Sequence, residues 1–141
     1  MIPALFMRFG VAFALIGMGL GIFMGATHDF SLTPAHAHVN LVGWVSMFLA
    51  GLFYQANPDR ATWLAALHLI LAVAGLSLMA PGVTAIARGM SWGEPLAIAG
   101  SIATFAATLI LAFNVFRAQA LSRDAHKPLS RENDARVLAS Q

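Results

Sequence analysis

The chain has 141 residues, of which 59% are hydrophobic and only 10% are charged, and its mean hydropathy is +0.75. Soluble domains carry about 25% charged residues, so this composition excludes an ordinary soluble protein and predicts an integral membrane protein. The absence of cysteine excludes disulfides, iron–sulfur clusters and thiolate metal sites, which leaves histidine as the strong metal ligand.

Four apolar stretches are long enough to cross a bilayer, since a spanning helix needs about 20 apolar residues. The fold class that we predict is therefore an all-α integral membrane protein with a four-helix bundle. The bundle domain covers residues 1–120, and residues 121–141, with His126 as a solvated histidine, form a polar cytoplasmic tail. The predicted spans are residues 3–26, 34–55, 61–80 and 95–116.

The first span carries a glycine at every fourth position, at Gly17, Gly21 and Gly25. This pattern of small residues lets another helix approach its backbone closely. The flat edge of a cofactor could use the same face. Packing against a neighbouring helix is the interpretation that we favour.

The connection to the second span contains His28 and Asp29. Asp29 could accept a hydrogen bond from a metal-ligating histidine, although a solvated loop carboxylate is the commoner arrangement. Pro34 suits the first turn of a helix, where its missing N–H has no partner in any case. Thr33 or Ser31 is expected to cap that helix.

The second span opens with His36 and His38, one to two turns inside the membrane, followed by Asn40. Ionisable side chains inside a span are costly, so they are read as functional by default. On an α-helix, residues i and i+2 lie about 200° apart, so the two imidazoles should face two different neighbours. An extended backbone would instead put both rings on one side. The alternative to a functional role is that both rings bind loop carbonyls.

The third span holds His68, about two turns in from the opposite face of the membrane. Pro81 and Gly82 either end or kink this span, and the remainder to Ala87 is either helical or interfacial. At 1.5 Å of rise per residue, His68 and His38 differ in depth by something on the order of 10 Å. We therefore do not expect these two histidines to share one metal ion.

The basic residues are distributed unevenly between the two sides of the membrane. Only Arg88 falls on one side, whereas the other side holds Arg8, Arg60, Arg117, Arg123, Lys127, Arg131 and Arg136. The positive-inside rule then places both termini in the cytoplasm. The same residues explain the isoelectric point of about 9.9 without a nucleic-acid partner. In this orientation His28, His36 and His38 lie toward the outer face, and His68 lies in the inner half.

The start of the second span resembles a ligand-bearing helix of subunit I of the haem–copper oxidases, through the segment LTPAHAHVN at residues 32–40 and the Gly43-Trp44 pair. The likeness is to the branch that includes the nitric oxide reductases, where a span begins with a similar Leu-x-Pro-x-His-x-Asn pattern. The pair of histidines two apart also resembles another helix of that subunit, in which they serve two different haems. Short four-span membrane proteins with the same HAH signature are likewise similar to this chain.

This resemblance implies a haem b-binding protein of the bacterial cytoplasmic (inner) membrane. His36 and His38 would be axial ligands of haem iron, with Asn40 beside the imidazole or a propionate, or else acting as a contact between helices. The implied function is electron transfer with a respiratory-chain partner, or haem-dependent sensing. The tyrosine that the oxidases place near copper has no counterpart, because Tyr54 sits at the far end of its helix. Oxygen reduction by this chain alone is therefore not expected.

The resemblance also implies an assembly, because subunit I has twelve spans in three four-helix arcs. If one chain corresponds to one arc, three chains rebuild the ring as a homotrimer. Independently of the resemblance, the spacing of His36 and His38 requires neighbours on both sides of the second span.

The sequence is also compatible with two other functions. One is a non-haem protein that handles copper or zinc through His28, His36 and His38 near the outer face. The other is a structural subunit that packs against a respiratory complex. His68 is a further candidate ligand of lower standing, since a histidine in this setting is most often buried and hydrogen-bonded.

Overall fold

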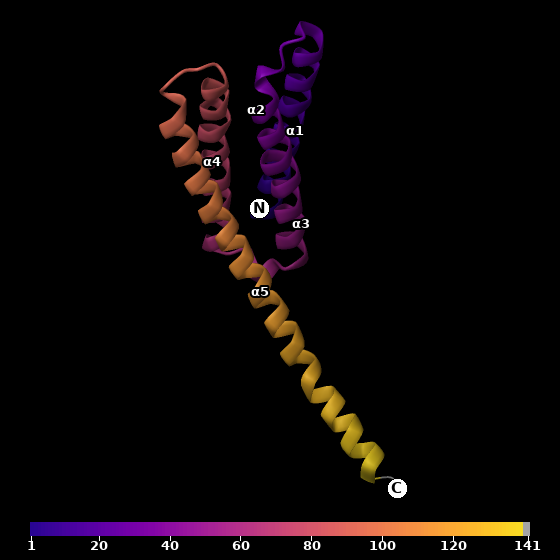
Figure 1. Cartoon of the computed structure of the whole chain (residues 1–141). Helices are drawn as coiled ribbons and strands as arrows, with labels where there is room; N and C mark the ends of the chain where they lie inside the picture. The colour runs from indigo at the N-terminus through magenta and orange to yellow at the C-terminus, as the bar shows by residue number, and fades with distance from the viewer. Residues whose placement is uncertain (140–141) are drawn as a thin grey trace. The chain divides into compact units, whose positions relative to one another are not determined.

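The computed structural model describes the backbone of residues 1–139 and the side chains of residues 1–118. Within residues 1–139 every regular element is a helix, as predicted (Figure 1). The chain divides into two compact parts, Met1–Leu111 and Ala112–Gln141. The helices are α1 (Ile2–Thr27), η1 (Phe30–Leu32), α2 (Thr33–His38), η2 (Val39–Ser46), α3 (Met47–Ala56), η3 (Pro58–Arg60), α4 (Trp63–Ala87) and α5 (Gly93–Ala139).

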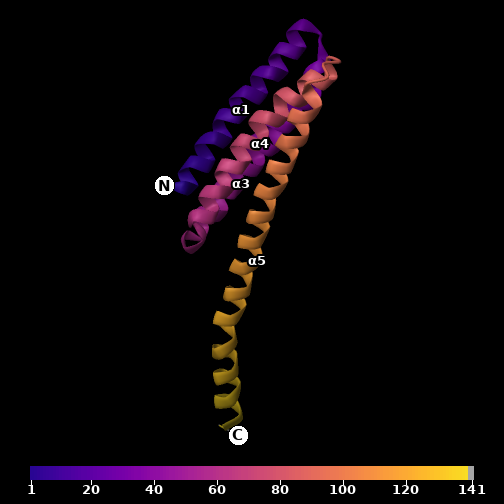
Figure 2. The same cartoon turned by 90° about the vertical axis from the view of Figure 1, so that its left-hand side faces the viewer.

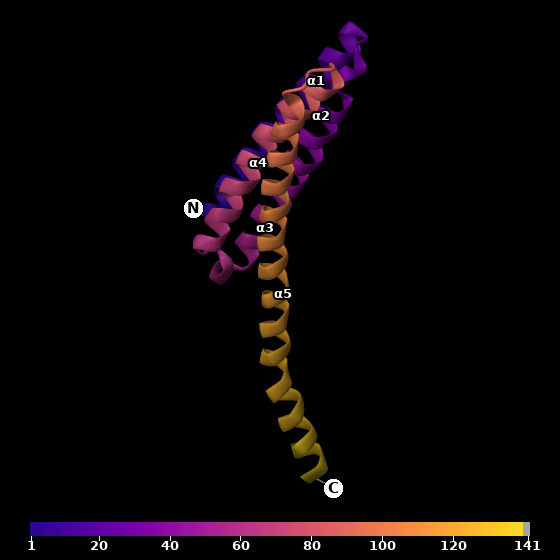
Figure 3. The same cartoon turned by 60° about the vertical axis from the view of Figure 1, so that its left-hand side comes forward.

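Four helical stretches are long and apolar enough to cross a membrane, which confirms the predicted number of spans. They are Ile2–Thr27, Phe30–Ala56, Trp63–Ala87 and Gly93–Ala118. In Figures 2 and 3 the N terminus of α1 lies at the same end of the bundle as η3, and the α1–α2 and α4–α5 connections lie at the other end. The chain therefore passes up and down between neighbouring helices.

The third span is longer than the predicted 61–80. Helix α4 continues through Pro81 to Ala87, so Pro81 does not end it. A proline is tolerated inside a membrane helix where neighbouring groups compensate for the lost hydrogen bond. The continuation also packs closely on α5, because a Cβ added to Gly82 would lie 2.5 Å from the backbone nitrogen of Ala97.

Glycines bring α4 and the first part of α5 into close contact. A Cβ on Gly75 would lie 3.0 Å from the carbonyl oxygen of Gly100, and a Cβ on Gly93 would lie 2.6 Å from that of Gly82. The two glycines of each helix are seven residues apart, so they fall on one face. Small residues at such an interface allow backbone-to-backbone packing inside a bilayer.

The second span is not one regular α-helix. It begins with the 3₁₀ turn η1, continues as α2, becomes the π-helix η2 over Val39–Ser46 and ends as α3. The hydroxyl of Ser46 donates to the carbonyl oxygen of Leu41, five residues earlier, at 2.8 Å. At Gly43 the π-helix is held between two helices, since a Cβ there would lie 2.6 Å from Leu76 of α4 and 2.8 Å from Phe13 of α1.

The expectation that Thr33 or Ser31 caps the second span is wrong. Asp29 is the capping residue, because its Oδ1 accepts from the backbone N–H of Ser31 at 3.0 Å and so starts η1. That hydrogen bond lowers the pKa of the exposed Asp29 carboxyl below its ordinary value. The hydroxyl of Thr33 instead donates back to the carbonyl oxygen of Phe30 at 2.7 Å.

The interior of Met1–Leu111 is apolar around the buried Tyr54–His68 pair. Tyr54 is 0% exposed and His68 is 5% exposed, and the hydroxyl of Tyr54 lies 3.1 Å from Nδ1 of His68. The apolar cluster that surrounds them includes Phe6, Met47, Ala50, Ala65, Leu69, Ala72 and Ala107. Large apolar side chains also cover the outside of the bundle, as a lipid-facing surface requires; examples are Leu15, Ile22, Ile70 and Phe105.

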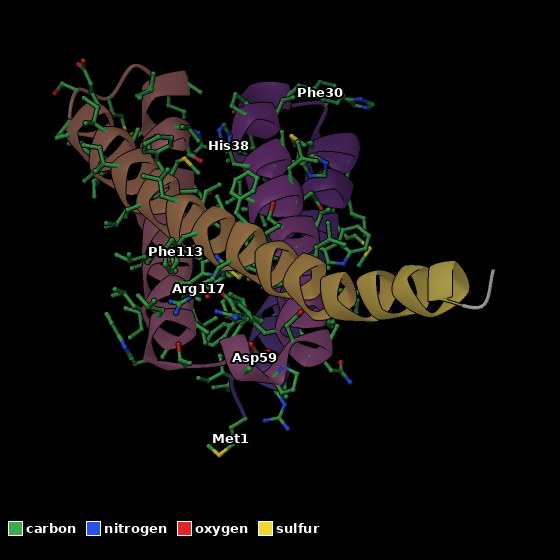
Figure 4. All side chains as sticks on the ribbon, turned by 90° about the horizontal axis from the view of Figure 1, so that it is seen from below. Met1, Phe30, His38, Asp59, Phe113 and Arg117 are labelled. Carbon is green, nitrogen blue, oxygen red and sulfur yellow. The ribbon has the colours of Figure 1, made fainter. Side chains whose placement is uncertain are left out.

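Charged side chains occur near the ends of the spans. Arg60, in η3, is buried and its Nε lies 2.8 Å from a carboxylate oxygen of Asp59. Within Ala112–Gln141, the guanidinium of Arg117 lies 5.9 Å from the centre of the Phe113 ring (Figure 4). Such a contact keeps the cation close to apolar surface. The tail predicted for residues 121–141 has a helical backbone to Ala139, and its side chains lie outside the described residues.

Candidate functional site

His36 faces α1, where two glycines make room for it. Its Nδ1 lies 2.8 Å from the carbonyl oxygen of Gly17, and a Cβ added to Gly21 would lie 3.0 Å from its Cε1. The ring is half-buried. The glycine face of the first span is thus an interface with the second span, and it fixes the position of this imidazole.

Asn40 occupies the same interface one turn further along. A Cβ on Gly17 would lie 2.5 Å from Nδ2 of Asn40, and this amide donates to the carbonyl oxygen of His36 at 2.9 Å. Gly25 continues the four-residue pattern, yet nothing lies within 4 Å of its added Cβ. Asn40 is therefore placed as a contact between helices that also holds the backbone of His36, and its predicted contact with a cofactor stays a prediction.

The hydrogen bonds of His36 determine which ring nitrogen carries the proton. A carbonyl oxygen only accepts, so Nδ1 must donate to Gly17. The amide nitrogen of Asn40 also lies near this Nδ1, but at 3.4 Å this contact is longer than the 2.8 Å bond to Gly17. This bond engages Nδ1 and leaves Nε2 as the ring nitrogen for another partner, through its lone pair when the ring is neutral.

His38 engages the same ring nitrogen through a different carbonyl. Its Nδ1 lies 2.7 Å from the carbonyl oxygen of Pro34, in its own helix, and its ring is half-buried. In Figure 4, His38 lies on the side of the second span away from α1 and toward α4. Because His36 contacts α1, the two imidazoles face different neighbours, as their spacing predicts.

The structure settles one alternative left open by the sequence and bears on another. The segment Thr33–His38 is helical, so the extended arrangement with both rings on one side does not occur. Both rings do bind carbonyl oxygens, but these belong to helices and not to loops. Each bond also engages only one nitrogen of the ring.

The remaining candidate ligands lie apart from this pair. His28 is exposed and ends α1 in the left-handed region at φ 54°. Asp29 accepts from the backbone N–H of Ser31, and no histidine within residues 1–118 is bonded to it. Among the described residues, no three or more histidine, aspartate or glutamate side chains converge on a point that could hold a metal ion. A copper or zinc site built from His28, His36 and His38 therefore does not come together within the described part of one chain.

The Tyr54–His68 pair is the feature that sequence reasoning missed. The sequence pattern indicates each residue only by itself, Tyr54 as a residue at the far end of its helix and His68 as a buried histidine. Phe6 of α1 covers both, with its ring centre 4.7 Å from that of His68 and 5.4 Å from that of Tyr54. Tyr54 lies near the end of α3 and His68 near the start of the antiparallel α4, so comparing their depths would have brought them together.

Comparison of the chain with protein-family models, with curated proteins and with solved structures finds no match. The fold defines a class, an all-helical protein with four helices suited to span a membrane. Within that class, the function has to be argued from the residues of the second span and from what surrounds them.

Replacing Gly21 with valine tests the placement of His36. The new side chain would overlap the imidazole, so we expect His36 to lose its hydrogen bond to Gly17. Nitrogen-15 NMR of labelled histidine should show the Nδ1 and Nε2 signals of His36 move toward the averaged values of a mobile ring. Gly25→Val, on the same face of α1 with open space around it, should leave the His36 signals unchanged. Equal effects of both variants would contradict the placement.

Proposed function

We propose that this chain is a haem b-binding membrane protein in which haem iron is held by two histidines from neighbouring chains. The observation that carries the proposal is that both His36 and His38 have Nδ1 bound to a carbonyl oxygen, at 2.8 and 2.7 Å. Metal-ligating histidines typically donate their other ring nitrogen in this way, which fixes the tautomer and orients the ring.

The donor set fits haem better than a non-haem metal. Haem iron supplies one-electron redox chemistry and needs only axial ligands from the protein. Structural zinc needs four ligands, and catalytic zinc keeps three protein ligands. The second span offers one imidazole on each of two sides, and among the described residues no group of three or more potential ligands forms.

The residues of the chain have distinct tasks in this proposal. His36 and His38 bind iron through Nε2, since Nδ1 is engaged. Gly17 and Gly21 hold the His36 ring, by a hydrogen bond and by the space that a missing side chain leaves. Asn40 holds the backbone of His36 through its carbonyl oxygen. Because both rings are half-buried, each keeps a surface through which a flat ligand can approach.

The proposed assembly is a closed ring of three identical chains. A ring of heterologous contacts gives every subunit one neighbour on each side, which is what two imidazoles on different sides of one helix require. Each site between chains then receives His36 from one chain and His38 from the next. The ring carries one haem per chain and exchanges electrons with a respiratory-chain partner or serves as a haem-dependent sensor.

The orientation in the bacterial inner membrane follows from the positive-inside rule, with both termini in the cytoplasm. Reporter fusions after Asn57 and at the C terminus should behave as cytoplasmic, and a fusion after Gly89 as external. Gly89 lies in the α4–α5 connection, at φ 73°, and Asn57 lies at the other end of the bundle. An external C terminus would reverse the orientation and place the histidine pair on the inner side.

Removing either ligand should change the haem. Purified protein should be red, with the sharp visible bands of a low-spin bis-histidine haem. His36→Ala and His38→Ala should each lose the haem or convert it to a weakly held high-spin form, because one axial ligand is lost. His126→Ala, in the predicted tail, is the control and should keep the wild-type spectrum.

Three results would overturn the haem assignment. If both single variants keep a wild-type low-spin spectrum, the ligands are other residues. A colourless preparation that contains copper or zinc by elemental analysis would favour a non-haem metal protein. A colourless preparation without metal would leave a structural subunit of a larger complex.

Mixing chains tests whether each site is shared. When His36→Ala and His38→Ala chains with different tags are expressed together, some sites should receive both intact ligands, one from each chain, although neither variant forms such a site alone. Tandem purification through both tags should therefore recover low-spin haem. A monomer that holds a full bis-histidine haem would exclude the ring and make His28 or His68 the second ligand.

A further inference from the structure

A second candidate site lies away from the histidine pair. It is a partly open cavity of about 140 Å³ between the second, third and fourth spans, within Met1–Leu111, with the exposed Ser46 and Thr108 at its edge. Its apolar wall includes Met47, Ala72 and Leu111, and its polar wall is formed by Ser46, His68, Thr104 and Thr108. On this measure a single water needs about 10–15 Å³, so the cavity has room for several waters.

The hydroxyl of Thr104 is the first reason to assign an occupant. Its Oγ1 is buried and has no hydrogen-bond partner among the described residues. A buried hydroxyl without a partner costs free energy, because it gave up its hydrogen bonds to water. Native proteins satisfy such groups with protein or with ordered water, and this group lies at the edge of a space large enough for water.

The other two hydroxyls on the wall are already used as donors. Thr108 donates to the carbonyl oxygen of Thr104 at 2.9 Å, and Ser46 donates to the carbonyl oxygen of Leu41 at 2.8 Å. Their lone pairs remain, so both can accept a hydrogen bond. The wall therefore offers acceptors at two positions and a donor at Thr104.

His68 adds an ionisable group to the same wall. Its ring is 5% exposed, and its Nδ1 pairs with the hydroxyl of Tyr54 at 3.1 Å. Nε2 is then the ring nitrogen available to an occupant of the cavity. A cavity lined only by apolar groups would stay dry, but a space with an imidazole and three hydroxyls gives water the two to four partners it needs.

We propose that this cavity is a water-binding site inside the membrane, in which water hydrogen-bonds to the Thr104 hydroxyl and to the His68 imidazole. The bound water would bring exchangeable protons next to the buried Tyr54–His68 pair. His68 is thereby a proton-exchanging group, although it lies within the apolar core. This proposal concerns different residues from the haem proposal and does not depend on it.

Water-edited solid-state NMR of the full chain in lipid bilayers tests the proposal. With nitrogen-15-labelled histidine, polarisation should pass from water to the His68 ring at a short mixing time in the wild type. Thr104→Val keeps the shape of the side chain and removes its hydroxyl, so this transfer to His68 should be lost or fall severalfold. Thr84→Val is the matched control, because Thr84 already donates to the carbonyl oxygen of Ala80 at 2.8 Å and does not line the cavity.

The outcomes separate water from the other occupants. Transfer to His68 that depends on Thr104 and not on Thr84 supports the water site. No transfer in the wild type overturns it, and so does contact of the His68 ring with the acyl chains of the lipid in a matching lipid-edited experiment. The nitrogen chemical shifts of the His68 ring in the Thr104→Val variant provide the folding control. If they show that the hydrogen bond between His68 and Tyr54 is retained, the variant is folded.

Discussion

The cost of an unsatisfied polar group in hydrocarbon governs the interior of this protein. With no bulk water in the bilayer core, polar side chains have to find partners within the protein. The protein meets this requirement mainly with its own backbone. His36 donates to Gly17, Ser46 donates to Leu41 and Thr108 donates to Thr104, in each case to a carbonyl oxygen. The histidine pair and the cavity are therefore related. In each, a polar group has no backbone partner among these bonds: Nε2 of the two imidazoles in the pair, and the hydroxyl of Thr104 in the cavity.

Glycine is what makes these partners reachable. The carbonyl oxygen of Gly17 can accept from another helix because no side chain at Gly17 or Gly21 keeps the imidazole away. In a bilayer, helices gain little from burying apolar surface against one another, so close backbone packing and hydrogen bonds have to stabilise their association. The same principle explains α4 and α5, where Gly75 and Gly82 meet Gly93 and Gly100. Glycine residues thus allow both the close packing of the helices and the position of the His36 ring.

Much of the architecture could be predicted from apolar length alone, because a span is a local property of about 20 residues. The opposed directions of His36 and His38 were also predictable, since they depend only on helical rotation. The π-helix over Val39–Ser46 was not predictable in this way, because apolar length does not distinguish a π-helix from an α-helix, and neither does it reveal that Gly43 packs between α1 and α4. The pairing of Tyr54 with His68 likewise depends on which helices are neighbours. The sequence pattern carries no such information about contacts between helices, and the Asp29 cap was missed because the predicted helix began too late.

The π-helix has a consequence for the geometry of the second span as a whole. A π-turn closes its hydrogen bond over one more residue than an α-turn, so each residue of Val39–Ser46 advances the helix by a smaller rotation. The histidines before this segment and Tyr54 after it therefore have an angular offset that a regular helix of the same length would not give. The π-helix thus changes the direction in which Tyr54 points relative to His36 and His38. The imidazoles at one end of the span face two different sides, while the phenol of Tyr54 at the other end faces His68 of α4.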